Sequence, residues 1–469
     1  MESERTNLPD LSALVPVLPQ DGPRRLALYR ALRGLIETGA LPSGTKLPTT
    51  RDLAARFAIA RGAAVAAFEM LVAEGFAEAR TGAGTFVAGR VPLLRPPSAP
   101  VPAAERPRPE VFPAALGAAM PDRVSAEAFR RLLLRHATRP VAGQFHYGDP
   151  QGNRSLREAI AAYLGTARGV RCDPGQIVIT SGSQQALDLV LRGVLAPGAQ
   201  VWLEDPGYGQ ARAAVLGAGL APVPVPVGPE GLEVAAGIAA APAARAAYVT
   251  PSHQFPLGVA LSMRGRLALL DWAAAAGAWV IEDDYDSEFR YAGPPLAAMQ
   301  GMDGAGRVIY VGTFSKALYP GLRTGYLVLP APLLDPVLRL RDRTDRYPPV
   351  LTEAPLADFL AEGHFSRHLV RARRRVRGAR DALVAALAEG PLSALPPDQG
   401  LHLIARGPVD EARLLSLAQA AGLGGRALGP MHLGPVRDTG LVLGFSGGSA
   451  DVLAAAARRL NRLLAEGTG

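Results

Sequence analysis

Lysine is nearly absent from this chain. Lysine and arginine together number 50 in 469 residues, and only Lys46 and Lys316 are lysines, which leaves 48 arginines. Arginine keeps the positive charge but cannot lose its proton and form an imine with an aldehyde. A lysine retained in this background is therefore a candidate covalent site. A chance survivor on a solvated face is the alternative, and the residues around each lysine must decide.

Cysteine, metal-ligand clusters and long apolar runs are also scarce. The single Cys172 excludes a disulfide framework and fits a reducing cytoplasm. The seven histidines lack metal-ligand spacing, so no metal site is predicted. The longest apolar stretch, 267–281, is interrupted by Asp271 and is too short to cross a bilayer. Residues 1–5 are polar and acidic, unlike a signal peptide, so we expect a cytoplasmic protein without membrane association.

The charge that is present is concentrated near the N-terminus. The whole chain carries +8, and from Arg24 to Arg90 nine arginines and one lysine face five acidic residues, a net charge of +5. Such a basic segment is typical of a nucleic-acid-binding module. The arginine bias of a GC-rich genome is an alternative explanation.

The chain divides into three sections. Residues 1–88 have helical patterning, 89–113 are rich in proline and indicate a semi-rigid linker, and 114–469 alternate strand-like and helical runs. Short apolar runs separated by helices predict an α/β fold with a mainly parallel sheet covered on both faces. These runs are 177–179, 201–203, 247–249, 279–281, 308–311 and 325–328.

The first section has the element order of a winged helix-turn-helix. Thr49 and Thr50 are good caps for a helix over 51–57, and a second helix is predicted over 61–74. Residues available for burial on the second helix are Val65, Phe68, Met70 and Leu71. Two short strands, over 76–79 and 85–87, then alternate around a Gly-rich turn.

Residues suited to binding or catalysis follow several strands of the third section. Small residues at 181–185 open a helix and expose N–H groups suited to phosphate. Acidic residues and Tyr285 follow the strand at 279–281, and Ser315 and Lys316 follow the strand at 308–311. Ligands of open α/β sheets bind outside the carboxyl ends of strands. Phosphate donors, a carboxylate, a phenol and an imine-forming amine together describe a pyridoxal 5′-phosphate (PLP) site.

The motifs carry a family resemblance over nearly the whole chain. SGSQQ at 181–185, EDPGY at 204–208 and SK…GLRTGY within 315–326 resemble the fold-type I aminotransferases. TPSHQFP at 250–256, EDDYDSEFRY at 282–291 and GTFSK at 312–316 are most similar to the MocR/GabR-type regulators. In that group a GntR-family winged helix precedes an aminotransferase-like domain. The resemblance implies a small C-terminal α+β subdomain over about 330–469.

Roles for the site residues are implied by the resemblance. Lys316 would form an aldimine with PLP, and Asp283 would pair with the pyridine nitrogen and keep it protonated. Tyr285 would hydrogen-bond the ring hydroxyl, with His253 or Gln254 nearby. The remaining expected contacts are the stacking ring of Tyr208, the phosphate ligands Ser181, Gly182, Ser183, Ser315 and Arg323, and Tyr147 reaching the phosphate of a neighbouring subunit.

A ligand carboxylate should need an arginine from the C-terminal subdomain, for which Arg437 and Arg426 are candidates. One departure from the family lies nearby. Leu257 stands where the family usually has threonine, and we expect altered local hydrogen bonding there without an effect on whether the cofactor binds.

The N-terminal motifs LPTTRDLA at 47–54 and GAGTFV at 82–87 resemble the GntR helix start and wing. The resemblance places the second helix in the major groove of DNA and the wing tip beside it. The implied DNA contacts are Thr49, Thr50, Arg51, Arg61, Arg80, Gly82 and Gly84, and Lys46 is expected near a phosphate. The recognition helix departs from the family because alanines at 60–68 replace hydroxyls and a second arginine. Base readout could therefore be weak, or shifted to Arg56, Arg61 and the wing.

The leading hypothesis is a PLP-responsive transcriptional regulator that binds a double-stranded DNA operator. A small amine, an amino acid or vitamin B6 in the form of PLP would be the effector, and a head-to-tail homodimer is expected by resemblance. The competing hypothesis is an active aminotransferase with a weak or vestigial DNA-binding module. A PLP-binding protein with neither activity is the third.

Overall fold

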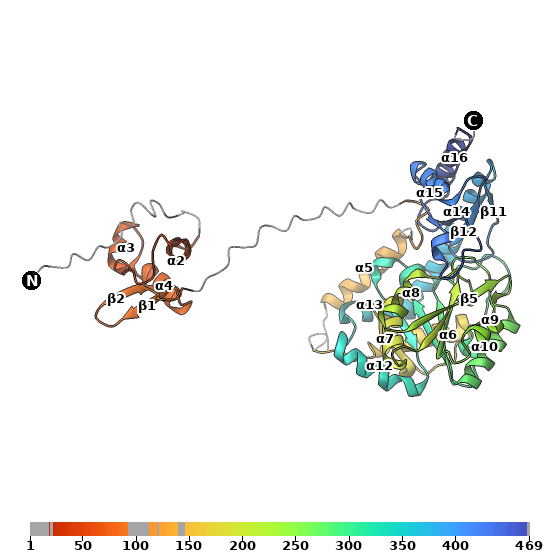
Figure 1. Cartoon of the computed structure of the whole chain (residues 1–469), viewed down its shortest axis with the longest axis horizontal. Helices are drawn as coiled ribbons and strands as arrows, with labels where there is room; N and C mark the ends of the chain where they lie inside the picture. The colour runs from red at the N-terminus through yellow and green to blue at the C-terminus, as the bar shows by residue number, and fades with distance from the viewer. Residues whose placement is uncertain (1–17, 19–21, 92–111, 120–121, 139–145, 467–469) are drawn as a thin grey trace, which may run out of the picture. The chain divides into compact units, whose positions relative to one another are not determined.

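The computed structural model describes residues 18, 22–91, 112–119, 122–138 and 146–466, and most of the expected linker lies outside this range. The chain forms two compact units, Met1–Arg108 and Pro109–Gly469 (Figure 1). No helix in the described part of the chain is long and apolar enough to span a membrane.

The first unit is built from helices α2 (Arg24–Glu37), α3 (Thr50–Arg56) and α4 (Arg61–Ala73), followed by strands β1 (Ala77–Arg80) and β2 (Gly84–Val87). The strands form an antiparallel hairpin. This order confirms the predicted winged helix-turn-helix architecture.

Packing and capping explain why these short helices form. The Thr49 hydroxyl accepts a hydrogen bond from the Asp52 N–H at 3.2 Å, and the Asp52 carboxylate accepts from the Thr49 N–H, which completes a capping box before α3. Leu28, Leu71 and Phe76 are buried in the shared core. Val65 was expected to be buried but is 36% exposed, because Ala64 and Phe68 provide the inward-facing positions of α4.

The second unit contains a mainly parallel sheet of eight strands, as predicted. Strands β9, β8, β7, β4 and β5 are parallel, and β10 runs antiparallel to both of its neighbours, β3 and β9. In spatial order the strands are β3 (Ile177–Thr180), β10 (Gly325–Val328), β9 (Val308–Thr313), β8 (Trp279–Asp284), β7 (Ala246–Val249), β4 (Gln200–Asp205), β5 (Ala221–Gly228) and β6 (Gly231–Leu232).

Helices cover both faces of this sheet because successive side chains of the buried strands point to opposite faces. In β9, Ile309 and Val311 pack with α7 (Ser183–Val194), α8 (Gly209–Gly217) and α12 (Ala331–Thr344). Val308 and Tyr310 belong to the clusters on the other face. The helices there are α5 (Arg123–Thr138), α6 (Arg154–Arg168), α9 (Val234–Ala240), α10 (Met263–Ala276) and α13 (Val350–Ala361).

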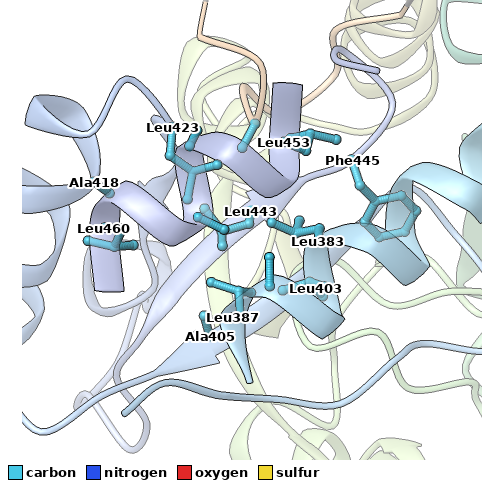
Figure 2. Packing of buried hydrophobic residues seen from close by; sticks show 14 of the residues in the cluster. Leu383, Leu387, Leu403, Ala405, Ala418, Leu423, Leu443, Phe445, Leu453 and Leu460 are labelled. Carbon is cyan, nitrogen blue, oxygen red and sulfur yellow. The ribbon is translucent and has the colours of Figure 1, made fainter. Parts of the chain in front are cut away.

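A second core lies in the C-terminal part of the chain (Figure 2). Leu383, Leu403, Leu443 and Leu460 meet there between helices and a four-stranded antiparallel sheet. We call this part the small subdomain. Its elements are α14 (His364–Leu387), β11 (Ser393–Ala394), β12 (His402–Arg406), α15 (Glu411–Ala420), β13 (Arg426–Ala427), β14 (Leu441–Gly444) and α16 (Ala450–Glu466). Helices α12 and α13 belong instead to the cores around the large sheet.

Short helices complete the second unit. Helix α11 (Phe314–Ala317) and the 3-10 turn η4 (Pro320–Leu322) follow β9 directly, at the carboxyl edge of the sheet. The other 3-10 turns are η2 (Pro174–Gln176), η3 (Gln300–Met302) and η5 (Gly429–Met431).

Candidate functional site

A cavity of about 280 Å³ opens where β7, β8 and β9 end. Asp283 near the end of β8, Tyr285 just beyond it and Lys316 on α11 line it. Ser183, Tyr208, Ser315, Arg323 and Arg426 line it as well. The structure therefore brings together one charged or polar group from each of the strand ends that the sequence singled out.

Asp283 is a buried carboxylate with one unused oxygen. Its Oδ2 accepts a hydrogen bond from the Tyr248 hydroxyl at 2.7 Å, whereas its Oδ1 has no partner among the described residues. Burial raises the pKa of Asp283 to about 7, although the hydrogen bond from Tyr248 opposes the shift. A buried carboxylate oxygen without a donor is suited to a cationic N–H group.

Lys316 lies on the short helix α11, which Thr313 caps by accepting from the Ser315 N–H at 3.1 Å. Burial lowers the pKa of the Lys316 ammonium from its ordinary value, and the attraction of Asp286 and Asp283 opposes this. The side chain reaches Gly117, where any Cβ would clash with Nζ. A lower pKa increases the fraction of neutral amine, the form that attacks an aldehyde.

The expected phosphate end of the cavity is cationic and formed by small residues. The Arg323 guanidinium donates to the Ser181 carbonyl at 2.8 Å, and the first turn of α7 begins at Ser183. Gly182 has φ 92°, and a Cβ there would lie 3.5 Å from the guanidinium. The Ser181 N–H, which was expected to hold phosphate, donates to the Gln185 side chain at 2.6 Å. Among the described contacts, the N–H groups in the first turn of α7 have no hydrogen-bond partner, as expected at a helix N-terminus.

His253 and Gln254 do not line the cavity. The Gln254 amide donates to the carbonyls of Pro206 at 2.9 Å and Phe255 at 2.7 Å, and its oxygen accepts from the Leu257 N–H at 2.9 Å. Gln254 thus holds its own loop together. His253 lies behind Tyr285, whose hydroxyl is 3.0 Å from the imidazole Nδ1.

Tyr208 and Tyr147, both predicted cofactor contacts, have different surroundings. Tyr208 lines the cavity and meets Phe255 edge-on at 5.8 Å. Tyr147 is 77% exposed, and its ring packs on Tyr347 at 5.8 Å with the Arg346 guanidinium above it. Tyr147 is therefore not a contact of the cavity in its own chain.

The structure separates the two candidate arginines of the small subdomain. Arg426, on β13, lines the cavity, whereas Arg437 lies on an exposed loop that does not. Tyr248, Gly117 and His402 are lining residues that the sequence argument missed. Tyr248 lies in a predicted strand that ends at the site and could have been found; Gly117 and His402 come from distant segments without a local signal.

Most of the candidate DNA contacts occupy exposed positions of the first unit. Arg51, Arg61 and Arg80 are exposed, and the Arg80 guanidinium lies 4.5 Å from the centre of the Phe86 ring. The other predicted contacts comprise Thr49, which caps α3, Thr50, which is half-buried, and Gly82 and Gly84, which have positive φ in the hairpin turn. Lys46 is half-buried, with Nζ 5.9 Å from the centre of the Phe86 ring.

Family comparisons agree with both units. Residues 122–423 match the family model for aminotransferases of class I and II, and residues 24–87 match that for bacterial regulatory proteins of the gntR family. The fold and these matches define a regulator-like helix-turn-helix unit joined to an aminotransferase-like unit.

Relatives with the same organisation narrow the class. The chain is 37% identical over 451 residues to the probable rhizopine catabolism regulatory protein MocR of Rhizobium meliloti, with 91% of each chain covered. It is 32% identical to the pyridoxine biosynthesis regulator PdxR of Corynebacterium glutamicum, covering 94% of this chain and 95% of that one. The chain belongs to the MocR-type transcriptional regulators, in which a GntR helix-turn-helix precedes an aminotransferase-like domain.

Solved structures match the second unit. The kynurenine aminotransferase of Pyrococcus horikoshii aligns with a TM-score of 0.68 and 28% identity over 75% of this chain and 90% of the other. An archaeal alanine:glyoxylate aminotransferase aligns with a TM-score of 0.70 and 26% identity over 75% and 90%. The class I and II aminotransferase family is PLP-dependent, and this likeness makes PLP the cofactor to test.

Proposed function

We propose that this MocR-type regulator binds PLP at Lys316 and double-stranded DNA through its first unit, and that a small amine, an amino acid or PLP itself changes its DNA binding. The observation that carries the proposal is the buried Oδ1 of Asp283, which has no hydrogen-bond partner in the described part of the chain and belongs to a residue that lines the same cavity as Lys316.

The described residues fit PLP. Asp283 would hold the ring nitrogen, Tyr285 would face the ring hydroxyl, and Tyr208 would cover the ring. Arg323, Ser315 and the first N–H groups of α7 would hold the phosphate. When bound, PLP supplies an aldehyde carbon and an electron-withdrawing ring. Asp283 would keep the proton on the ring nitrogen, and Lys316 would supply the neutral amine.

Arg426 is the arginine that we propose for an effector carboxylate, because it lines the cavity and Arg437 does not. A guanidinium can bind a carboxylate with two parallel hydrogen bonds. Since β13 belongs to the small subdomain, an effector held between Arg426 and the large sheet would favour one position of that subdomain over others.

The domain boundaries and assembly remain proposals. We infer a DNA-binding domain over 1–88, a linker over 89–113 and a PLP-binding domain over 114–469. The exposed Tyr147 supports a head-to-tail homodimer in which this ring reaches the neighbouring site. DNA binding implies a cytoplasmic location.

An active aminotransferase is the second candidate, favoured by the fact that Lys316, Asp283 and Arg323 all line one cavity. A gel-shift with the chain's own upstream DNA across salt concentrations separates the two functions. A regulator binds with an affinity whose logarithm falls linearly with the logarithm of salt. No shift at low salt together with rapid multiple-turnover transamination would establish the enzyme instead.

The cofactor site can be tested by trapping, since the chain has only two lysines. Incubation with PLP followed by borohydride reduction should label the peptide that contains Lys316 and leave Lys46 unlabelled in a mass-spectrometric map. Lys316→Ala should lose both the label and the visible absorption, and Lys46→Ala is the matched control that keeps them. Equal labelling of both lysines, or visible absorption that persists in Lys316→Ala, would refute the site.

A further inference from the structure

The segment that leads into β12 connects the small subdomain to the large sheet. We call residues 398–402 the Gly400 segment. The Gln399 side-chain amide donates to the Ser252 carbonyl at 2.5 Å, in the loop after β7. The Gly400 N–H donates to the Phe289 carbonyl at 2.7 Å, in the loop after β8. Two of the loops that supply lining residues to the cavity are thus hydrogen-bonded to one segment of the small subdomain.

His253 is enclosed directly beneath this segment. The imidazole is 2% exposed, and any Cβ at Gly400 would clash with it. A Cβ at Gly258 would lie 3.3 Å from its Nε2. Gly400 also has φ 82°, which favours glycine. The ring therefore fills a slot between two glycines, and the Gly400 segment cannot move toward the ring without displacing it.

The same ring holds the phenol that faces the cavity. The Tyr285 hydroxyl donates to the His253 carbonyl at 3.0 Å and lies 3.0 Å from Nδ1. Nδ1 is also 2.9 Å from Oδ2 of Asp286, which is buried as well. Tyr285 is thus anchored to the backbone and the ring of His253, and the described hydrogen bonds include none from its hydroxyl to the small subdomain.

A second histidine closes the slot. His402, on β12, donates through Nε2 to the Pro256 carbonyl at 3.0 Å, and its ring centre is 4.8 Å from that of His253. Burial, with the repulsion of His253, lowers the pKa of His402 well below its ordinary value, so this neighbour is neutral. The contact between His402 and the loop that carries His253 and Pro256 is therefore one of packing and a hydrogen bond.

We propose that His253 is a positioning residue that couples the Gly400 segment of the small subdomain to the cavity-facing phenol of Tyr285. A ligand that moves Tyr285 shifts the small subdomain, and the reverse holds by linkage. The idea that an effector signal passes along this route rests on the proposed function. The coupling between the Gly400 segment and Tyr285 does not require a ligand.

The coupling is tested first in the full-length protein without cofactor, by hydrogen exchange at residues 399–402. Tyr285→Phe removes the hydroxyl that anchors to His253, and a lost hydrogen bond should speed exchange about two- to tenfold. Tyr208→Phe is the matched control, a cavity-lining phenol without a hydrogen bond to His253 among the described contacts, and should leave exchange unchanged. In a His253→Ala background, Tyr285→Phe should have a smaller effect than in wild type, because the ring between the phenol and the Gly400 segment is gone and only the hydrogen bond to the carbonyl of residue 253 remains to be lost. Unchanged exchange in Tyr285→Phe, or equal acceleration in both phenol variants, overturns the proposal.

The coupling from the small subdomain to the cavity is tested with Gly400→Ala, whose methyl group would clash with the His253 ring. Gly422→Ala is the control for backbone strain, because it has φ 68° in the same subdomain but faces only Arg459, at 3.4 Å. With PLP added, Gly400→Ala should shift the absorption maximum of the bound cofactor, and Gly422→Ala should not. Identical spectra overturn the proposal. If wild-type protein binds no PLP, the proposed function fails, whereas the exchange experiment still decides the coupling.

Discussion

Burial governs the chemistry of the ionisable side chains at the site. Asp283 has a pKa raised to about 7, and the pKa of Lys316 is lowered, in both cases chiefly through the loss of water around the charged form. Both shifts favour the neutral forms of these two groups. A cation next to the unpartnered Oδ1 of Asp283 would restore the carboxylate, so cofactor binding and the charge of Asp283 are linked.

A pH dependence follows from Asp283. Its folded-state pKa of about 7 lies above the unfolded value near 4, so the folded protein binds the extra proton between these pH values. The contribution of Asp283 to the stability of the cofactor-free protein is therefore greater at pH 5 than at pH 8, and it is lost as pH rises through this window. Between pH 5 and pH 8, the free energy of unfolding of Asp283→Asn should fall by on the order of 2 kcal/mol less than that of the wild-type protein.

Urea unfolding followed by tryptophan fluorescence measures this change, since all three tryptophans lie in the second unit. Exposed Asp271→Asn is the control and should retain the wild-type dependence. If the free energy of unfolding of Asp283→Asn varied with pH as in the wild type, a raised pKa for this carboxyl would be contradicted. Other buried acids, such as Glu204, should preserve part of the wild-type slope, because burial raises the pKa of Glu204 to about 7 as well.

At the scale of single elements, packing explains part of the alanine-rich composition of the recognition helix, α4. Ala64 and Ala67 are fully buried, so packing against the core accounts for alanine at these two positions. Among residues 61–69 the exposed positions include Arg61, Val65 and Glu69. The helix presents one arginine to solvent in this stretch, so we propose that DNA affinity rests on phosphate contacts distributed over the unit.

The salt dependence of DNA binding tests this distribution. Arg61→Ala and Arg80→Ala should each weaken binding at all sequences and reduce the slope of log affinity against log salt by about 1. Arg130→Ala, which removes an exposed arginine of the second unit paired with Glu127, should leave the slope unchanged. Fluorescence anisotropy with the upstream DNA at several salt concentrations gives the slopes. A loss of affinity confined to one DNA sequence would instead identify a base contact.

For the whole molecule, the function requires that the cofactor site and the DNA-binding unit act on each other. A ligand shifts DNA affinity only if it interacts differently with the states that bind DNA well and poorly. Lys316→Ala would remove the proposed covalent contact with PLP, and it changes no residue of the first unit. Its DNA affinity without ligand should stay within about twofold of wild type, while the change in affinity on adding PLP should disappear.

The same anisotropy titration, with and without PLP, measures this response, and Lys46→Ala tests the other lysine. Lys46 lies in the first unit, so its loss should weaken DNA binding and preserve the PLP response. A PLP response that survives in Lys316→Ala would show that the covalent contact does not transmit the signal.

The sequence by itself determined the two kinds of unit and the central residues of the site. Apolar runs of strand length predicted the parallel sheet, and because such strands end at one edge, Lys316, Asp283 and Arg323 could be placed together without coordinates. Thr49 and the hairpin after α4 followed from local capping and turn chemistry, which act over a few residues.

Only the tertiary structure decided which long-range neighbours complete the site. Arg426 lines the cavity, whereas Arg437 does not. The Gln254 amide and the Ser181 N–H are bonded within the protein, and Gly117 and His402 are lining residues that the sequence did not predict. These outcomes depend on how distant segments pack and on which donors are already used by their own loops. A sequence pattern records the periodicity of an element but not the partner that its side chains meet across the core.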